Sequence, residues 1–286
     1  MAAQPNEPNR VAVSLAPLDT ENCLQELEHL APRIGMAEIR LDLMRTFDIE
    51  KIVTTSKVPL ILTCRPERER GGFTGPESER LAVLRDAYEC ECAYIDVELD
   101  SLDIVSGWRG SATRIIASQH WFDRMPADLQ AIYLTLRDRC DAVKLVGTPA
   151  SAADVLPVFE LLENATTPVI GIAMGSQGTC TRILSPAFRP CLLTYGSARK
   201  TTASTAPGQI TVDEMVDRYA LHLVNAGTEM YLHIISSDRQ HQAVLARQEK
   251  AVRGAELHAS LMTTDPATLA ALATEMLPDM NIETGA

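Results

Sequence analysis

The sequence predicts a closed (β/α)8 barrel of the TIM type, followed by a small C-terminal α/β extension. Eight short apolar segments, rich in β-branched residues, are typical of buried parallel strands; they span residues 11–17, 37–43, 60–66, 94–100, 114–120, 141–147, 168–174 and 192–198. The intervening stretches place apolar residues three or four apart, as amphipathic helices do, notably at 20–32, 77–92, 127–139, 151–164 and 211–226. Eight alternations within about 220 residues fit a barrel near the lower end of its usual size of ~250 residues.

An open, doubly wound sheet is the main alternative fold. Such a sheet usually carries a glycine-rich turn after its first strand. The segment from Leu15 to Asp19 contains no glycine, so the barrel is favoured.

Composition limits the classes of function. The chain has 286 residues, of which 46% are apolar and 22% are charged, and this balance indicates a folded globular protein. Its formal net charge of −12, without any basic cluster, argues against a nucleic-acid partner. Small anionic substrates would therefore need arginines placed locally in a site.

The cysteines and the N-terminus indicate the compartment. Seven scattered cysteines and a polar N-terminal segment without an apolar core predict a protein of the reducing cytoplasm with no signal peptide. Cys90 and Cys92 have no second pair at metal-site spacing, so we expect them to pack in the core. No apolar run approaches the ~20 residues of a membrane span, so we expect a soluble protein without a membrane partner.

Ionisable residues interrupt five of the predicted strands. In a barrel, the carboxyl ends of the strands and the loops after them form the reactive face. Alternation along the second strand places its charged side chains on one face and its apolar ones on the other, so the charged face should point into the barrel. These residues predict one site at the barrel mouth: Glu38, Arg40, Arg65, Glu98, His120 and Lys144.

Lys144 is the most informative of these residues, because it lies in the middle of a predicted buried strand. Burial disfavours the ammonium form, and a neutral amine can attack a carbonyl to form a Schiff base. A snorkelling edge lysine or a structural ion pair is the alternative for Lys144 considered alone. His120 closes the preceding strand and could act as acid and base, with Glu98 orienting its ring. Glu98 could instead bind a divalent metal, but the nearby Lys144 would compete with a cation, so no metal is expected.

Taken in order, the polar motifs resemble those of the type I 3-dehydroquinate dehydratases over residues 10–226. The motifs are Glu38-x-Arg40-x-Asp42, Thr63-x-Arg65 followed by Gly71-Gly72, Asp96-x-Glu98, Ser118-x-His120, Lys144, Met174-Gly175 with Arg182, and Ala206-Pro207-Gly208-Gln209. The resemblance implies loss of water from 3-dehydroquinate in the shikimate pathway, through a lysine Schiff base and without a metal or an organic cofactor.

The resemblance also implies a role for each site residue. Lys144 would form the imine with the C3 ketone, and His120 would remove a C2 proton and then assist departure of the C1 hydroxyl while Glu98 orients it. Arg182 would clamp the substrate carboxylate through two parallel hydrogen bonds. The remaining substrate-binding positions implied are Glu38, Arg40, Arg65, Met174, Thr205 and Gln209.

Two departures from the family pattern stand near the predicted site. Thr205 replaces a serine that is common four residues before the loop glutamine. Arg70 stands where a glutamate commonly precedes the Gly71-Gly72 pair, with Glu69 before it in a slightly longer segment. That loop is therefore expected to bind differently, and the imine chemistry is expected to be unaffected.

The last 60 residues or so predict a separate unit from residue 227 to the end. Their pattern is strand, helix, strand, helix, strand, at 230–235, 240–252, 256–262, 266–276 and near 280–282. This order weakly resembles the start of a shikimate dehydrogenase substrate domain, without that family's catalytic lysine. We expect a docking or oligomerisation module rather than a second activity, and a homodimer overall. Another Schiff-base barrel, such as an aldolase, or a non-catalytic metabolite sensor are the rival functions.

Overall fold

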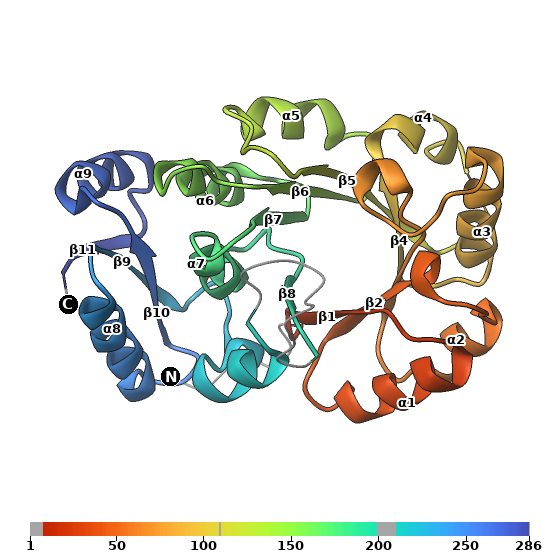
Figure 1. The fold of residues 1–286 in the computed structure, drawn as a ribbon, viewed down its shortest axis with the longest axis horizontal. Helices are drawn as coiled ribbons and strands as arrows, with labels where there is room; N and C mark the ends of the chain where they lie inside the picture. Colours follow the sequence, from red (N-terminus) through yellow and green to blue (C-terminus); the bar gives the residue numbers. More distant parts are fainter. Residues whose placement is uncertain (1–7, 109, 199–209, 286) are drawn as a thin grey trace.

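The computed structural model describes residues 8–108, 110–198 and 210–285 and confirms the barrel. One sheet of eight parallel strands has the order β7-β6-β5-β4-β3-β2-β1-β8, and helices cover its outer face (Figure 1). The strands are β1 (Val11–Leu15), β2 (Met36–Arg40), β3 (Leu60–Thr63), β4 (Tyr94–Glu98), β5 (Arg114–Trp121), β6 (Ala142–Gly147), β7 (Val169–Ala173) and β8 (Thr194–Gly196). The sheet wraps round so that β8 pairs with β1, while an isolated bridge between Val169 and Cys191 links β7 to the segment before β8.

Alternation along the strands separates an apolar plug from a polar layer inside the barrel. The plug includes buried residues from six of the strands: Ala12, Ile61, Tyr94, Ile116, Ala142 and Ile170. Two residues further along five of these strands, the side chains are Ser14, Thr63, Asp96, Ser118 and Lys144. Because strand side chains repeat every second residue, this polar layer lies one step closer to the carboxyl ends. The site thus rests on a packed apolar floor.

The covering helices are short. They are α1 (Thr20–Leu30), α2 (Ile49–Thr55), α3 (Glu77–Glu89), α4 (Leu102–Val105), α5 (Leu129–Leu136), α6 (Leu156–Asn164) and α7 (Thr179–Leu184). In three of them an aspartate accepts a hydrogen bond from a backbone N–H of the first turn and so fixes the start of the helix: Asp19, Asp48 and Asp128. The helix predicted at 77–92 ends early, because Glu91 adopts a left-handed φ of 57°.

The α-helix predicted at 211–226 is wrong. This stretch forms a π-helical turn at Glu214–Arg218 and a 3-10 turn at Leu221–Leu223, with Ala220 between them at a φ of 52°. Tyr219 and Leu221 are both buried although they are two residues apart, which one face of an α-helix does not allow. Arg253 binds two carbonyl groups of the π-helical turn, at 2.8 and 3.0 Å, and so satisfies them from outside the segment.

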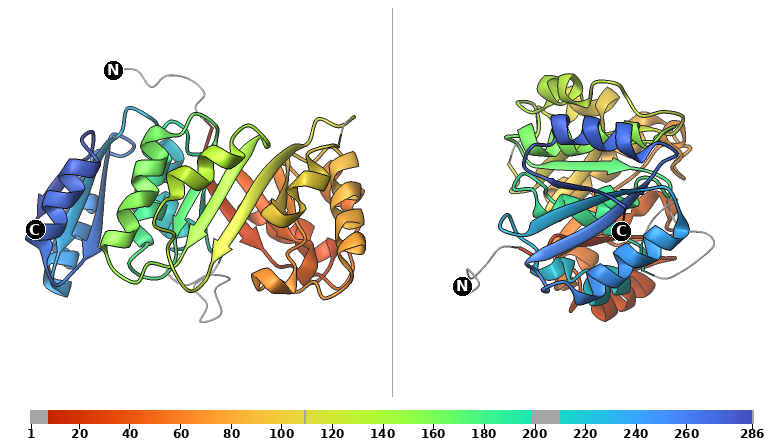
Figure 2. Two further views of the ribbon diagram at one scale, coloured as in Figure 1. Left: turned by 90° about the horizontal axis from the view of Figure 1, so that it is seen from above. Right: turned by 90° about the vertical axis from the view of Figure 1, so that its left-hand side faces the viewer.

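The C-terminal extension has the predicted order of elements and lies at one end of the molecule (Figure 2). Its elements are β9 (Glu229–Ile235), α8 (Asp238–Lys250), β10 (Glu256–Met262), α9 (Pro266–Met276) and β11 (Asn281–Thr284). They form a parallel three-stranded sheet in the order β10-β9-β11. The extension packs against the barrel through β10 and α7. Among the described residues, no helix is long and apolar enough to cross a membrane.

A histidine pair inside the extension should make this unit sensitive to acid. The ring of His233 is fully buried in β9, and its Nε2 lies 2.9 Å from Nδ1 of His258. Burial, with the neighbouring His258 as a lesser cause, lowers the pKa of His233 to about 4. Protonation therefore favours the unfolded chain, where a histidine pKa is near 6.5.

We predict that the free energy of unfolding of the extension falls by about 2 kcal/mol as the pH drops from 7 to 5. Hydrogen exchange of β9 and β10, followed by mass spectrometry at several pH values, would measure this change. His233→Gln should flatten the dependence, whereas His29→Gln, at an exposed position of α1, should leave it intact. An unchanged pH dependence in His233→Gln would contradict the assignment.

Candidate active site

Lys144 lies inside the barrel, as the sequence predicts. It is 4% exposed in the middle of β6, and its Nζ donates to Asp96 Oδ2 at 2.8 Å, Glu38 Oε2 at 3.3 Å and Tyr195 Oη at 3.4 Å. Arg65 and Lys144 hold the pKa of the Asp96 carboxyl below its ordinary range, against the opposing effect of burial. Two acidic side chains thus neutralise the buried ammonium group.

Arg65 binds side chains of β4 and β5 and so connects one side of the site. Its guanidinium binds Asp96 at 2.9 Å, Glu98 at 2.7 Å and the hydroxyl of Ser118 at 2.9 Å, and it lies 3.4 Å from Glu69. An arginine that is 4% exposed requires such partners, because an unpaired buried charge is strongly unfavourable. The network links the segment after β3 to β4 and β5.

The expected contact between Glu98 and His120 is not formed. Glu98 instead binds two arginines, Arg65 at 2.7 Å and Arg80 at 2.5 Å, and it is 1% exposed. Burial, partly offset by these arginines, raises the pKa of Glu98. The reason for the difference is that Arg80, from α3, reaches the carboxyl end of β4 and holds Glu98 on the outer side of Arg65.

Glu69 takes the place beside the imidazole that was assigned to Glu98. Its Oε2 lies 2.9 Å from Nδ1 of His120. Glu69 ends a 3-10 turn (Glu67–Glu69) in the loop after β3, and that loop folds back on Arg65. Gly71 permits this fold, because a Cβ there would lie 1.9 Å from the carbonyl oxygen of Arg65. The sequence did contain a signal, since Glu69 stands four residues after Arg65 and directly before the arginine that departs from the family pattern.

The pKa values of His120 and Glu69 are shifted in opposite directions from their ordinary values. Burial, with Arg65 and Lys144 as lesser causes, lowers the pKa of His120 well below its ordinary value. Burial also raises the pKa of Glu69 to about 7, helped by Glu98 and Asp96 and opposed by Arg65. The imidazole is therefore neutral at neutral pH, and the state of Glu69 decides which ring nitrogen carries the proton.

This arrangement predicts how activity depends on pH. When Glu69 is ionised it accepts the Nδ1 proton, and Nε2 is then free to act as a base; when Glu69 is protonated it donates to Nδ1, and Nε2 keeps its proton. The rate should accordingly rise through a pH of about 7, as Glu69 loses its proton. Glu69→Gln should lower kcat by roughly tenfold to a hundredfold and abolish this rise. A profile that keeps its inflection near pH 7 in Glu69→Gln, or loses it in the matched loop variant Glu67→Gln, would contradict the prediction.

Arg182 and Met174 are brought to the same site by the segment after β7. Arg182 is 2% exposed in α7; its Nη1 donates to the carbonyl of Tyr195 at 3.3 Å, and its Nε has no hydrogen-bond partner among the described residues. Burial lowers the pKa of Arg182 to about 10, so the guanidinium is still charged at neutral pH. A buried cation with no acidic partner in the described part of the chain is suited to binding an anion.

Arg40 lies at the mouth and is paired within its own segment. Its guanidinium binds Asp42 through two hydrogen bonds of 2.9 and 2.6 Å. Asp42 also accepts hydrogen bonds from the backbone N–H groups of Arg65 and Gly72, at 3.1 and 2.8 Å. Arg40 and Asp42 therefore anchor the loop that carries Glu69.

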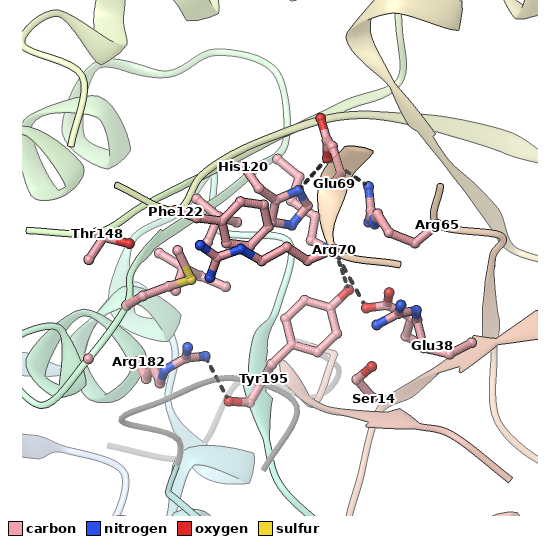
Figure 3. Close-up of a pocket in the computed structure, with 16 residues that line it drawn as sticks. Ser14, Glu38, Arg65, Glu69, Arg70, His120, Phe122, Thr148, Arg182 and Tyr195 are labelled. Carbon is pink, nitrogen blue, oxygen red and sulfur yellow. Dashed lines mark hydrogen bonds and ion pairs between the residues drawn. The ribbon is translucent and has the colours of Figure 1, made fainter. Parts of the chain in front are cut away.

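These side chains surround a cavity of about 310 Å³ at the carboxyl ends of the strands (Figure 3). Its lining includes seven residues that the sequence assigned to the site: Glu38, Arg40, Arg65, His120, Lys144, Met174 and Arg182. It also includes Glu69 and Tyr195, which sequence reasoning did not select. Thr205 and Gln209, also predicted to bind substrate, lie outside the described residues. The described part of the chain contains no cluster of acidic, histidine or cysteine residues that could hold a metal ion.

Comparison with known proteins agrees with this geometry. The family model described as type I 3-dehydroquinase matches residues 11–226. The chain is 30% identical to the 3-dehydroquinate dehydratase of Methanocaldococcus jannaschii over 209 residues, which cover 70% of this chain and 93% of the relative. It is 33% identical over 207 residues to the chloroplastic bifunctional 3-dehydroquinate dehydratase/shikimate dehydrogenase of Arabidopsis thaliana, covering 68% of this chain but only 34% of that protein.

Solved structures share the fold. The 3-dehydroquinate dehydratase of Geobacillus kaustophilus matches with a TM-score of 0.63 and 24% identity, over 74% of this chain and 89% of that one. The dehydroquinate dehydratase and shikimate dehydrogenase of S. pombe matches 97% of this chain and 57% of its own, with a TM-score of 0.58 and 17% identity. The second match includes the extension as well as the barrel. From the matched residues and the site that they build, the chain belongs to the type I 3-dehydroquinase family.

Proposed function

We propose that the chain is a 3-dehydroquinate dehydratase, a carbon–oxygen lyase that removes water from 3-dehydroquinate to give 3-dehydroshikimate. The observation that carries this proposal is the position of Lys144, which lines one cavity together with a neutral His120 and the charged Arg182. An amine, a base and an anion-binding group are the three functions that the reaction needs.

In the first stage, Lys144 condenses with the C3 ketone and expels water to form an imine. The ammonium group gives up two protons in this step, and the ketone oxygen leaves with them as water. The imine draws electrons from the neighbouring carbon and acidifies its C2 protons. Arg182 holds the substrate carboxylate and so fixes the ring against Lys144 and His120.

In the second stage, His120 removes a C2 proton through Nε2, because Nδ1 is engaged by Glu69. The electron pair forms a double bond towards C1, and the C1 hydroxyl leaves as water with the proton that His120 carries. Hydrolysis of the product imine returns the Lys144 amine and releases the enone. Glu69, rather than Glu98, is the residue that we propose orients the imidazole.

The other residues of the cavity complete the proposed site. Glu38 is held by Thr63 at 3.0 Å and Arg40 by Asp42, so both are fixed in place towards the ring hydroxyls. Met174 supplies an apolar wall. Thr205 and Gln209 keep their proposed roles in substrate binding and loop closure on the basis of the family pattern. A continuous absorbance assay for the enone product tests the function, and absence of enone from purified protein with 3-dehydroquinate would exclude it.

We propose two units, a barrel at 1–226 and an extension at 227–286 that serves in docking or oligomerisation. The second, separate parallel sheet of the extension supports this division.

Seven free cysteines support a cytoplasmic location. The proposal of a homodimer rests on the family resemblance, and light scattering of the purified chain tests it.

A further inference from the structure

Arg70 adds a positive charge to the site that the family pattern does not include. It stands directly before the Gly71-Gly72 pair, where a glutamate is common in the family, and Glu69 precedes it in a slightly longer segment. Its φ of 56° lies in the left-handed region, which is unfavourable for a residue with a Cβ. Backbone hydrogen bonds around it, from Arg70 N to Glu67 O at 2.9 Å and from Gly71 N to Pro66 O at 3.0 Å, maintain this conformation.

The side chain of Arg70 reaches across the mouth of the cavity. Its guanidinium carbon lies 4.3 Å from the ring centroid of Phe122, and that ring is stacked nearly parallel to His120 at 5.8 Å. A cation over an aromatic face is held electrostatically while its N–H groups stay available at the edges. Figure 3 shows the guanidinium in front of Phe122, among the residues that line the cavity.

The cationic side chains of this cavity fall into two groups, according to whether they bind a carboxylate of the protein. Five cationic side chains line it, namely Arg40, Arg65, Arg70, Lys144 and Arg182. Arg40, Arg65 and Lys144 each bind a carboxylate of the protein. Arg70 and Arg182 bind none among residues 8–108, 110–198 and 210–285. The segment 199–209 contains no aspartate or glutamate, so it offers neither arginine an acidic partner.

We propose that Arg70 is a second anion-binding residue of this site, which holds the substrate carboxylate from the mouth while Arg182 holds it from within. A carboxylate has two oxygens and about four acceptor positions, so two guanidinium groups can share it. The inference deepens the proposed function and makes Arg70 a specificity-determining residue for carboxylate substrates. Its contribution is to binding rather than to the proton transfers.

Steady-state kinetics of Arg70→Gln and Arg70→Lys test this role. Arg70→Gln should raise KM for 3-dehydroquinate about tenfold with kcat changed less than twofold, because a charge-assisted hydrogen bond is lost from binding. Arg70→Lys, which keeps the charge, should recover part of the affinity. The difference in KM between wild type and Arg70→Gln should shrink at high ionic strength, since salt screens an exposed charge. Arg68→Gln is the matched control, because Arg68 lies in the same loop but binds Asp100 and Glu77.

A binding measurement separates this inference from the proposed function. An NMR titration of each protein with benzoate, a simple carboxylate, needs no turnover, and Arg70→Gln should weaken the affinity severalfold. If wild type forms no enone but Arg70→Gln still loses benzoate affinity, the proposed function is wrong and the anion contact stands. If kcat falls while KM and benzoate affinity are unchanged, Arg70 acts by positioning His120 through Phe122, and the inference is overturned. Unchanged kinetics and benzoate affinity in Arg70→Gln also overturn it.

Discussion

Replacing Lys144 with alanine is expected to abolish covalent trapping of the substrate and to lower kcat by about 10⁴-fold or more. Wild-type protein treated with 3-dehydroquinate and borohydride should gain one reduced adduct, and peptide mass spectrometry should find it on Lys144. No other residue of the described cavity lining is a lysine, so Lys144→Ala should gain no adduct there. The effect is large because the imine is the electron sink for the whole reaction.

Lys144→Ala also removes a positive charge from the buried carboxylates of Asp96 and Glu38. Loss of activity must therefore be distinguished from loss of the fold. Removing one partner of a buried ion pair can cost ~3–5 kcal/mol when the other is left alone. In Lys144→Ala, Asp96 still has its ion pair with Arg65 at 2.9 Å, and Glu38 still accepts a hydrogen bond from the Thr63 hydroxyl at 3.0 Å. We therefore expect the variant to fold. Circular dichroism checks this, and Lys57→Ala, at an exposed pair with Glu28, is the matched control. An adduct on a different lysine in wild type would refute the assignment of the nucleophile.

The barrel could be predicted because its signals are local. A buried parallel strand is apolar along most of its length, and a surface helix repeats every three to four residues, so both patterns are visible in the sequence. The placement of Lys144 and His120 in one cavity follows from the same alternation, since their strands are neighbours and both side chains point inward. The structure adds a local signal that the sequence analysis did not use, since Asp19, Asp48 and Asp128 cap the starts of three helices.

What could not be predicted depends on contacts between distant segments. The choice between Glu69 and Glu98 as the partner of His120 is made by Arg80, which reaches from α3 and holds Glu98 away from the ring. The conformation of the loop around Arg70 also depends on other segments, because the backbone N–H of Gly72 donates to the carboxylate of Asp42 and that of Phe73 donates to the carbonyl of Arg65. The failed helix at 211–226 has the same origin, since Arg253 from the extension binds its carbonyls.

His120→Ala is expected to lower kcat by about 10²–10⁴-fold while the imine on Lys144 still accumulates. The imidazole serves proton removal from C2, departure of the C1 hydroxyl and hydrolysis of the product imine, whereas the bond to substrate is made by the amine. Mass spectrometry without borohydride, after mixing with 3-dehydroquinate, should therefore show a larger fraction of covalent complex in the variant than in wild type. His29→Ala, at an exposed position, should behave as wild type does.

The combination of slow turnover and persistent adduct distinguishes the proposed role of His120 from a structural one. A variant that only misfolds the mouth would lose the adduct together with the activity, because Lys144 and Arg182 would no longer share one cavity. Near-normal turnover in His120→Ala would exclude the imidazole as the acid and base. Because the pKa of His120 is well below its ordinary value, the imidazole should stay neutral as the pH falls below 7, and the loss of rate there should follow Glu69. Combining Glu69→Gln with His120→Ala should therefore add little to the effect of His120→Ala alone, since Glu69 acts through the ring that is already absent.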